Sequence, residues 1–213
     1  MNVKSISLVV ATSLSGWSLV HADITAVTDW GYSGGIYCYT PLWDSAGSVG
    51  IDGYQSGLGQ MGGMITTSDA VDPTLTINNS INNDSGFAWT GYIVDVFLNT
   101  NFSISFPAVP VSNPSGWAAG VIIPVHFDSG SGLWTGTIDY TGGTPVSPVS
   151  GDPNNEFDFA YKVTFGGLTQ YSLTESVTPV PEPGAFSLLM IGGLVLGGRV
   201  MAGCRPRKLR VEI

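Results

Sequence analysis

The sequence predicts an all-β protein whose body is an antiparallel β-sandwich or jelly roll. Apolar and polar residues alternate with a period of two in several segments, such as Thr74–Ile77 and Phe102–Phe106. Clusters of Gly, Pro, Asn and Asp separate these segments, and no window of the body shows the long 3.6-residue apolar period of a helix. Because 43% of the 213 residues are hydrophobic, a packed core is expected rather than a disordered chain.

Residues 1–22 have the features of a secretory signal peptide. Lys4 precedes an apolar run, and the aliphatic Val20 and the small Ala22 occupy the positions that determine cleavage. We therefore expect cleavage between Ala22 and Asp23 and export of the body. The alternative is an uncleaved N-terminal anchor.

The exported domain is expected to span residues 23–175, with short strands joined by surface turns. The candidate strands are 36–40, 74–77, 87–98, 102–106, 117–127, 133–140, 157–165 and 170–174. A surface loop is expected at 146–155. Residues 176–213 are expected to form a linker followed by a C-terminal membrane segment.

Charge in the body is strongly one-sided. Between residues 23 and 180 there are fourteen acidic residues and one basic residue, Lys162, which gives a formal charge of −13. Nucleic-acid binding requires a clustered basic face, so nucleic acid is not expected as a partner. Such a surface also repels other polyanions and anionic lipid.

The C-terminal segment predicts one transmembrane helix at about 184–204. These 21 residues would measure about 31 Å as a helix, enough to cross the hydrocarbon layer of a bilayer. A basic tail, 205–213, follows at once. The basic residues of this tail are Arg205, Arg207, Lys208 and Arg210. Because positive charge is retained on the cytoplasmic side, they place the C-terminus in the cytoplasm and the body outside.

The tripeptide Pro181-Glu182-Pro183 stands immediately before this helix. Proline on both sides of Glu182 favours an extended, accessible backbone that a protease could bind. The order of Pro-Glu-Pro, Gly-rich apolar helix and basic cluster resembles the PEP-CTERM sorting signal of Gram-negative bacteria that make exopolysaccharide. Arg199 within the apolar run and the tail from Leu209 to Ile213 depart from that pattern.

The resemblance to PEP-CTERM proteins implies that an exosortase of the inner membrane recognises residues 181–183 and removes the helix. The protein would be anchored in the inner membrane with its body outside and then released to the cell surface or matrix. The alternative for the same residues is a Pro-rich linker into a plain membrane anchor. A weaker resemblance of 85–92 and 157–165 to body sequences of this family supports a sandwich and assigns no chemistry.

Two glycine motifs match enzyme signatures without the required context. Gly31–Gly35 fits G-x-S-x-G, but that motif needs a following helix, and His126 is the only histidine of the mature body. Gly57–Gly62 fits G-x-G-x-x-G outside a βαβ unit. We expect a turn before the strand 36–40 at the first motif and a flexible loop at the second. His126 alone cannot build a zinc site and is expected to bond locally.

Acidic side chains offer two further alternatives. Asp139, Glu156 and Asp158 could converge as the paired carboxylates of a secreted glycoside hydrolase. Loops 82–86, 128–130 and 151–156 carry oxygen ligands suited to Ca²⁺, but the same residues are ordinary turn formers, which we favour. No metal site and no cofactor are therefore predicted.

Aromatic residues are frequent in the body, and most are expected in the core. Tyr37, Tyr39 and Tyr54, with Trp residues 30, 43, 89, 117 and 134, are also candidates for a sugar-stacking platform. Cys38 is the only cysteine of the body and is expected to lie buried in a strand.

The terminal signals and the missing catalytic constellation predict a non-enzymatic protein of the cell surface or exopolysaccharide matrix, with a structural or interaction role. Its expected partners are the exosortase, the inner membrane before processing, and exopolysaccharide. A carbohydrate-binding module is the first alternative, and a carboxylate-dependent glycoside hydrolase is the second.

Overall fold

A computed structural model describes residues 22–39, 42–44, 47–108 and 111–183 and confirms the all-β class. The strands are β1 (Ile24–Cys38), β2 (Leu42–Asp44), β3 (Ser48–Thr67), β4 (Thr74–Asn83), β5 (Trp89–Leu98), β6 (Phe102–Ser105), β7 (Val111–Asn113), β8 (Ala118–Asp128), β9 (Leu133–Val146), β10 (Glu156–Phe165) and β11 (Gln170–Pro181).

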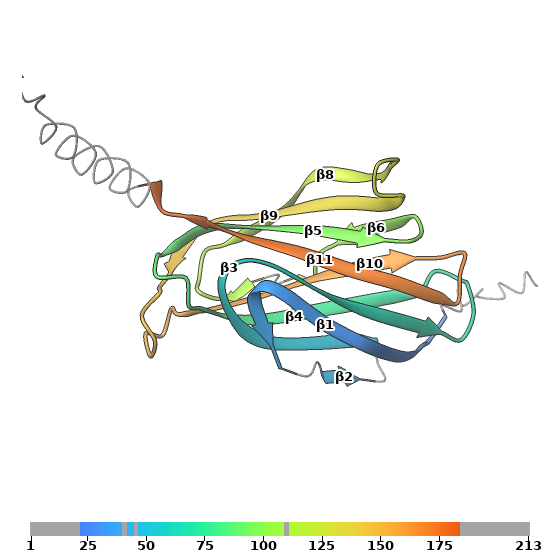
Figure 1. Cartoon of the computed structure of the whole chain (residues 1–213), viewed down its shortest axis with the longest axis horizontal. Coiled ribbons are helices and arrows are strands. Elements are labelled where there is room, and N and C mark those ends of the chain that lie inside the picture. The colour runs from blue at the N-terminus through green and yellow to red at the C-terminus, as the bar shows by residue number, and fades with distance from the viewer. Residues whose placement is uncertain (1–21, 40–41, 45–46, 109–110, 184–213) are drawn as a thin grey trace, which may run out of the picture.

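The strands form one sheet that curls into a nearly closed barrel, where the sequence predicted two packed sheets. The order along the sheet is β6-β10-β4-β3-β11-β5-β9-β8, while β1 and β2 pair with β3 and β7 pairs with β10. Neighbours are antiparallel except β3 and β4. The sheet stays continuous because β3, at 20 residues, is long enough to pair with β4 at its start and with β11 at its end. Figure 1 shows β8, β9 and β5 on one side of the molecule, β1 to β4 on the other, and β11 between them.

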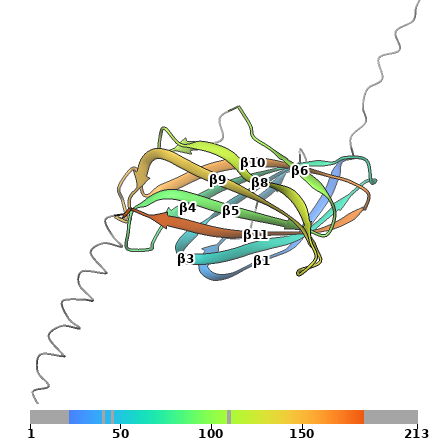
Figure 2. The same cartoon turned by 90° about the horizontal axis from the view of Figure 1, so that it is seen from above.

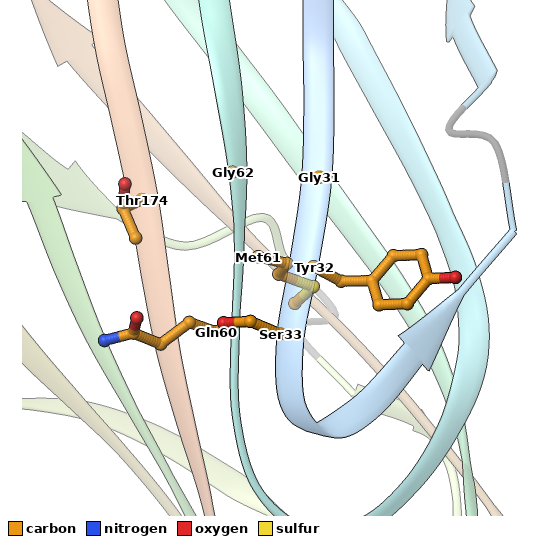
Figure 3. A pocket seen from close by; sticks show the side chains of 7 residues that line it. All are labelled: Gly31, Tyr32, Ser33, Gln60, Met61, Gly62 and Thr174. Carbon is orange, nitrogen blue, oxygen red and sulfur yellow. The ribbon is translucent and has the colours of Figure 1, made fainter.

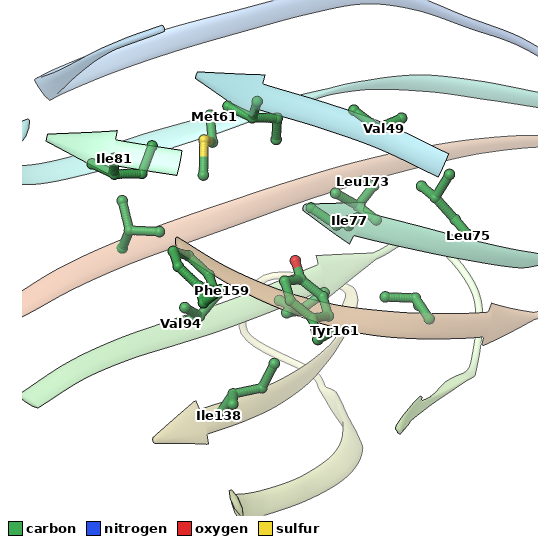
Figure 4. Packing of buried hydrophobic residues seen from close by; sticks show 14 of the residues in the cluster. Val49, Met61, Leu75, Ile77, Ile81, Val94, Ile138, Phe159, Tyr161 and Leu173 are labelled. Carbon is green, nitrogen blue, oxygen red and sulfur yellow. The ribbon is translucent and has the colours of Figure 1, made fainter. Parts of the chain in front are cut away.

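The core fills the space inside the curled sheet (Figure 4). Buried and less buried residues alternate along all of β10, along β5 from Tyr92 onward and along β11 as far as Val180. Their inward side chains include Val94, Phe159, Tyr161 and Leu173, which are almost completely buried. Burial of such side chains stabilises a domain by about 1.5–3 kcal/mol each, so this alternation is the main source of stability.

Three segments differ from the expectation. Gly57–Gly62, expected as a flexible loop, lies within β3, and Gly31–Gly35, expected as a turn, lies within β1. Glycine disfavours strands on its own, but here it permits close contact between neighbouring backbones. Residues 176–181, expected as a linker, are the last residues of β11 and pair with β5.

The described chain begins and ends at opposite ends of the molecule (Figures 1 and 2). The predicted signal peptide, apart from Ala22, lies outside the described residues, as do the predicted helix at 184–204 and the basic tail. Within the described part of the chain, no helix is long and apolar enough to span a membrane.

Candidate binding surface

Four exposed tyrosines form a continuous row on β1, β3 and the residue that follows β1. Tyr32, Tyr37, Tyr39 and Tyr54, here called the tyrosine row, are between 42% and 51% exposed. Successive ring centroids lie 5.0, 5.7 and 5.8 Å apart, and each pair meets edge to face. These separations are typical of favourable aromatic pairs, so the rings support one another at the surface.

Strand alternation explains why the row faces solvent. Cys38 is buried, which turns its neighbours Tyr37 and Tyr39 outward, and Tyr37 pairs with Tyr54 across the β1–β3 ladder. The hydroxyls of Tyr39 and Tyr54 lie 2.9 Å apart in a hydrogen bond. This bond is the main reason that the pKa of Tyr39 rises to about 12. The Tyr39 hydroxyl is therefore uncharged at neutral pH and donates a hydrogen bond to the Tyr54 hydroxyl.

A shallow depression adjoins the row where β1, β3 and β11 lie side by side. It consists of two hollows of about 220 and 300 Å³ that share Ser33 and Gln60. Thr174 lines the first and Ser176 lines the second. We call the depression the polar hollow after its uncharged polar residues Ser33, Gln60, Thr174 and Ser176, while Tyr32, Met61 and Leu58 supply the apolar part of its lining. Figure 3 shows Gln60 and Thr174 on one side of β1 while the ring of Tyr32 extends to the other side.

Glycines on β1 and β3 line the hollow. Gly31 and Gly62 face each other across the ladder in its first part, and Gly34 and Gly59 do so in its second. A Cβ at Gly62 would collide with the backbone of Leu173 on β11, whereas a Cβ at Gly31 would meet nothing within 4 Å. Gly34 has a φ of 76°, a conformation that other residues rarely adopt.

A buried polar cluster lies inside the sheet at Glu175. The Tyr161 hydroxyl and the Asn79 amide face its carboxyl and lower its pKa, but complete burial outweighs them and raises the pKa to about 8. Gln55 is also completely buried. Its side-chain amide donates to the carbonyls of Gly57 and Val177 at 2.7 and 3.1 Å and accepts from the Tyr92 hydroxyl.

Neither Glu175 nor Gln55 is a candidate site residue from the sequence. Glu175 lies between Leu173 and Val177 in the period-two pattern of β11. The sequence signal that could have identified Glu175 is a charged residue at a position where the period-two pattern calls for an apolar one.

The candidate carboxylates come together only in part. The Ser80 hydroxyl lies within hydrogen-bond distance of the carboxylates of both Glu156 and Asp158 on β10, the latter at 2.7 Å, and its single proton can be donated to one of them at a time. Partial burial and the neighbouring Glu156 raise the pKa of Asp158. Asp139 lies on β9, which does not pair with β10, and none of the three carboxylates lines the polar hollow.

The remaining predicted residues occupy ordinary structural positions. His126 lies 3.1 Å from the Pro124 carbonyl, which confirms a local bond, and Cys38 is a buried free thiol in β1. Backbone N–H groups donate to the side chains of Asn83, Asp128 and Asp152, as expected of turn formers. Among the residues that the structure describes, no three His, Cys, Asp or Glu side chains are grouped to hold a metal.

The predicted processing sites are both attached to the body. Pro181 pairs with Trp89 at the end of β11, and the Glu182 N–H donates to the Ala88 carbonyl at 3.1 Å. The side chains of Glu182 and Pro183 are exposed. At the other end, Ala22 is buried and the Asp23 N–H donates to the Ser68 hydroxyl at 3.0 Å.

Comparisons with known proteins assign no family to this fold. No family model, no curated protein and no solved structure matches the chain.

Proposed function

We propose that the chain is an exported protein of the cell surface or exopolysaccharide matrix, and that its body has an interaction role rather than a catalytic one. The tyrosine row is the observation that carries the interaction role. Its four rings share one exposed surface, whereas a soluble domain normally buries most of its aromatic area. Tyrosine provides a large contact area and a hydrogen-bonding hydroxyl at a small cost in side-chain entropy, and for this reason it is enriched in binding surfaces.

Sorting by an exosortase remains the proposed route to the surface, with the inner membrane as the transient anchor. The resemblance of residues 179–210 to the PEP-CTERM signal supports it. The exposed side chains of Glu182 and Pro183 at the end of β11 are compatible with recognition by a membrane-bound processing enzyme.

A carbohydrate-binding module is the second candidate function. The specific observation in its favour is that the tyrosine row adjoins an uncharged polar hollow. Sugars present apolar C–H faces that stack on aromatic rings and hydroxyls that bond to uncharged polar groups. A glycoside hydrolase has less support, because Glu156 and Asp158 lie away from this hollow.

Intact mass of the protein from the surface fraction of its native host tests the sorting proposal. We expect a form that begins at Asp23 and ends near Pro183, and we expect it only in cells that contain the exosortase. Glu182→Ala should leave the full C-terminus in place. Asp84→Ala, which removes an exposed carboxylate from a turn of the body, should be processed normally.

One result would overturn this part of the proposal. Protein that retains the residues through Ile213 both with and without the exosortase would be an ordinary membrane-anchored protein. The interaction role of the tyrosine row would then need a different route to the surface.

A further inference from the structure

We propose that the tyrosine row and the polar hollow form one site, and that its ligand is an extended, uncharged polysaccharide chain that crosses β1. This inference rests on the second candidate function and specifies its ligand class. It assigns a stacking role to the row and a hydrogen-bonding role to the hollow.

The stacking half consists of the tyrosine rings. Each ring of the row meets its neighbour edge to face, at interplanar angles of 66°, 87° and 70°. Neighbouring rings therefore cannot form one flat platform. Such a surface suits a chain of sugar units whose C–H faces turn from one unit to the next, rather than one large planar ligand.

The hydrogen-bonding half consists of Ser33, Gln60, Thr174 and Ser176 around the polar hollow. Their hydroxyl and amide groups both donate and accept, as sugar hydroxyls do. They come from β1, β3 and β11, which pair side by side through the register of Gln60 with Ser33 and Ser176. A rigid sheet thus holds the polar groups in fixed positions, which lowers the entropy cost of binding.

The two halves meet at consecutive residues of β1. Gly31, Tyr32 and Ser33 all line the hollow, and the Tyr32 ring extends to the side of β1 that lies away from Gln60 and Thr174 (Figure 3). The ring of Tyr32 also contacts Tyr37, at a centroid distance of 5.0 Å. Because β1 pairs only with β3 in the described sheet, no further strand covers its outer edge. A polymer can therefore pass over this edge from the row into the hollow.

Charge identifies the polymer class. The body carries a formal charge of −13 and has Lys162, on β10, as its one basic residue between 23 and 180. A polyanionic chain such as a polyuronate would be repelled. A cationic chain would favour carboxylates, and no carboxylate lines the hollow. An uncharged glycan is the remaining class, and it suits the hydroxyl and amide walls.

Affinity electrophoresis of the mature protein tests this assignment. Native gels would contain hydroxyethylcellulose or dextran as uncharged polymers, polygalacturonate as the anionic polymer, and chitosan as the cationic one. We expect an uncharged polymer to retard the protein at a salt concentration high enough to suppress non-specific attraction of the acidic body to chitosan. Tyr37→Ala should weaken it by about tenfold, the equivalent of 1.4 kcal/mol, while Tyr37→Phe keeps the ring and should retain binding.

A glycine pair tests the hollow separately from the row. Gly31→Gln would place a side chain in the hollow without a clash, because a Cβ there meets nothing within 4 Å. Gly120→Gln on β8 is the matched control, since Gly120 is equally free of contacts. We expect Gly31→Gln to weaken binding of long chains by about tenfold or more and to spare binding of short oligosaccharides. Gly120→Gln should bind both like the unmodified protein.

The outcomes distinguish failure of the two-part site from failure of the carbohydrate-binding and sorting proposals. Retardation by an uncharged polymer that Gly31→Gln does not alter would overturn the two-part site and leave a carbohydrate-binding module. Binding to chitosan or polygalacturonate alone would overturn the uncharged class. Retardation by none of the polymers would overturn both the inference and the carbohydrate-binding candidate, while the mass measurement would still decide sorting.

Discussion

Glu175 is a carboxyl group buried completely inside the curled sheet, with Tyr161 and Asn79 as its polar neighbours. Among the residues that the structure describes, no cation contributes to its environment. Tyr161, Tyr92, Tyr140 and the Cys38 thiol, whose own pKa values are all raised, face the same region. Desolvation therefore dominates, and the neutral carboxyl is the form that the folded state accommodates.

The first prediction at the residue scale is that stability falls as pH rises through neutrality. The pKa of Glu175 is about 8 in the folded protein, above its ordinary value of 4.5. Below pH 4.5 the Glu175 carboxyl is protonated in both the folded and the unfolded state, so the free energy of unfolding is not reduced by its ionisation. Between pH 4.5 and 8 the unfolded state releases the proton first, so stability declines by roughly 5 kcal/mol at most. Urea unfolding at a series of pH values measures this decline.

Glu175→Gln supplies the control, because the amide has the same shape and no charge. Its free energy of unfolding should change much less across this pH range, and near pH 9 it should exceed that of the unmodified protein. Equal pH slopes in the two proteins would show that other groups set the dependence.

At the scale of elements, the sequence predicted the strands with regular alternation and missed those rich in glycine. Strand β10 extends from Glu156 to Phe165, against an expected 157–165, because every second residue is apolar. Strand β3 was missed because its glycines have low strand propensity. Pairing with β11, which the sequence does not show, holds this segment extended. The tyrosines were candidates from sequence, but their exposure depends on β1 lying at an edge, which only the topology reveals.

The paired glycines of β1 and β3 give a prediction for this scale. Gly62→Ala should lower the free energy of unfolding by about 2–4 kcal/mol, because the new Cβ collides with the Leu173 backbone and β11 must shift. Gly31→Ala, at the position directly opposite, should change it by less than about 1 kcal/mol. Urea unfolding midpoints of the two variants measure the difference. Equal midpoints would mean that β3 and β11 are not in close backbone contact.

At the scale of the whole molecule, the sheet stops short of closure between β6 and β8. Strand β8 pairs with β9 on one side only within the described sheet, and Val121, Ile122, Ile123 and Phe127 on it are 40–53% exposed. An apolar edge of this kind favours association with another strand. The acidic charge of the body opposes this, because like-charged molecules repel one another over about 10 Å at 0.1 M salt.

Self-association should therefore increase with salt. At 1 M salt the screening length falls to about 3 Å, so the apolar edges of two molecules can meet. We expect sedimentation velocity to show a larger average mass at 1 M than at 0.02 M sodium chloride. Ile122→Lys should abolish the increase because it places a charge on the edge. Val149→Lys changes the net charge by the same amount, but it lies in a turn outside β8, where the side chain is 61% exposed. This variant should still show the increase in average mass at high salt. Equal suppression by both variants would assign the effect to net charge instead of the β8 edge.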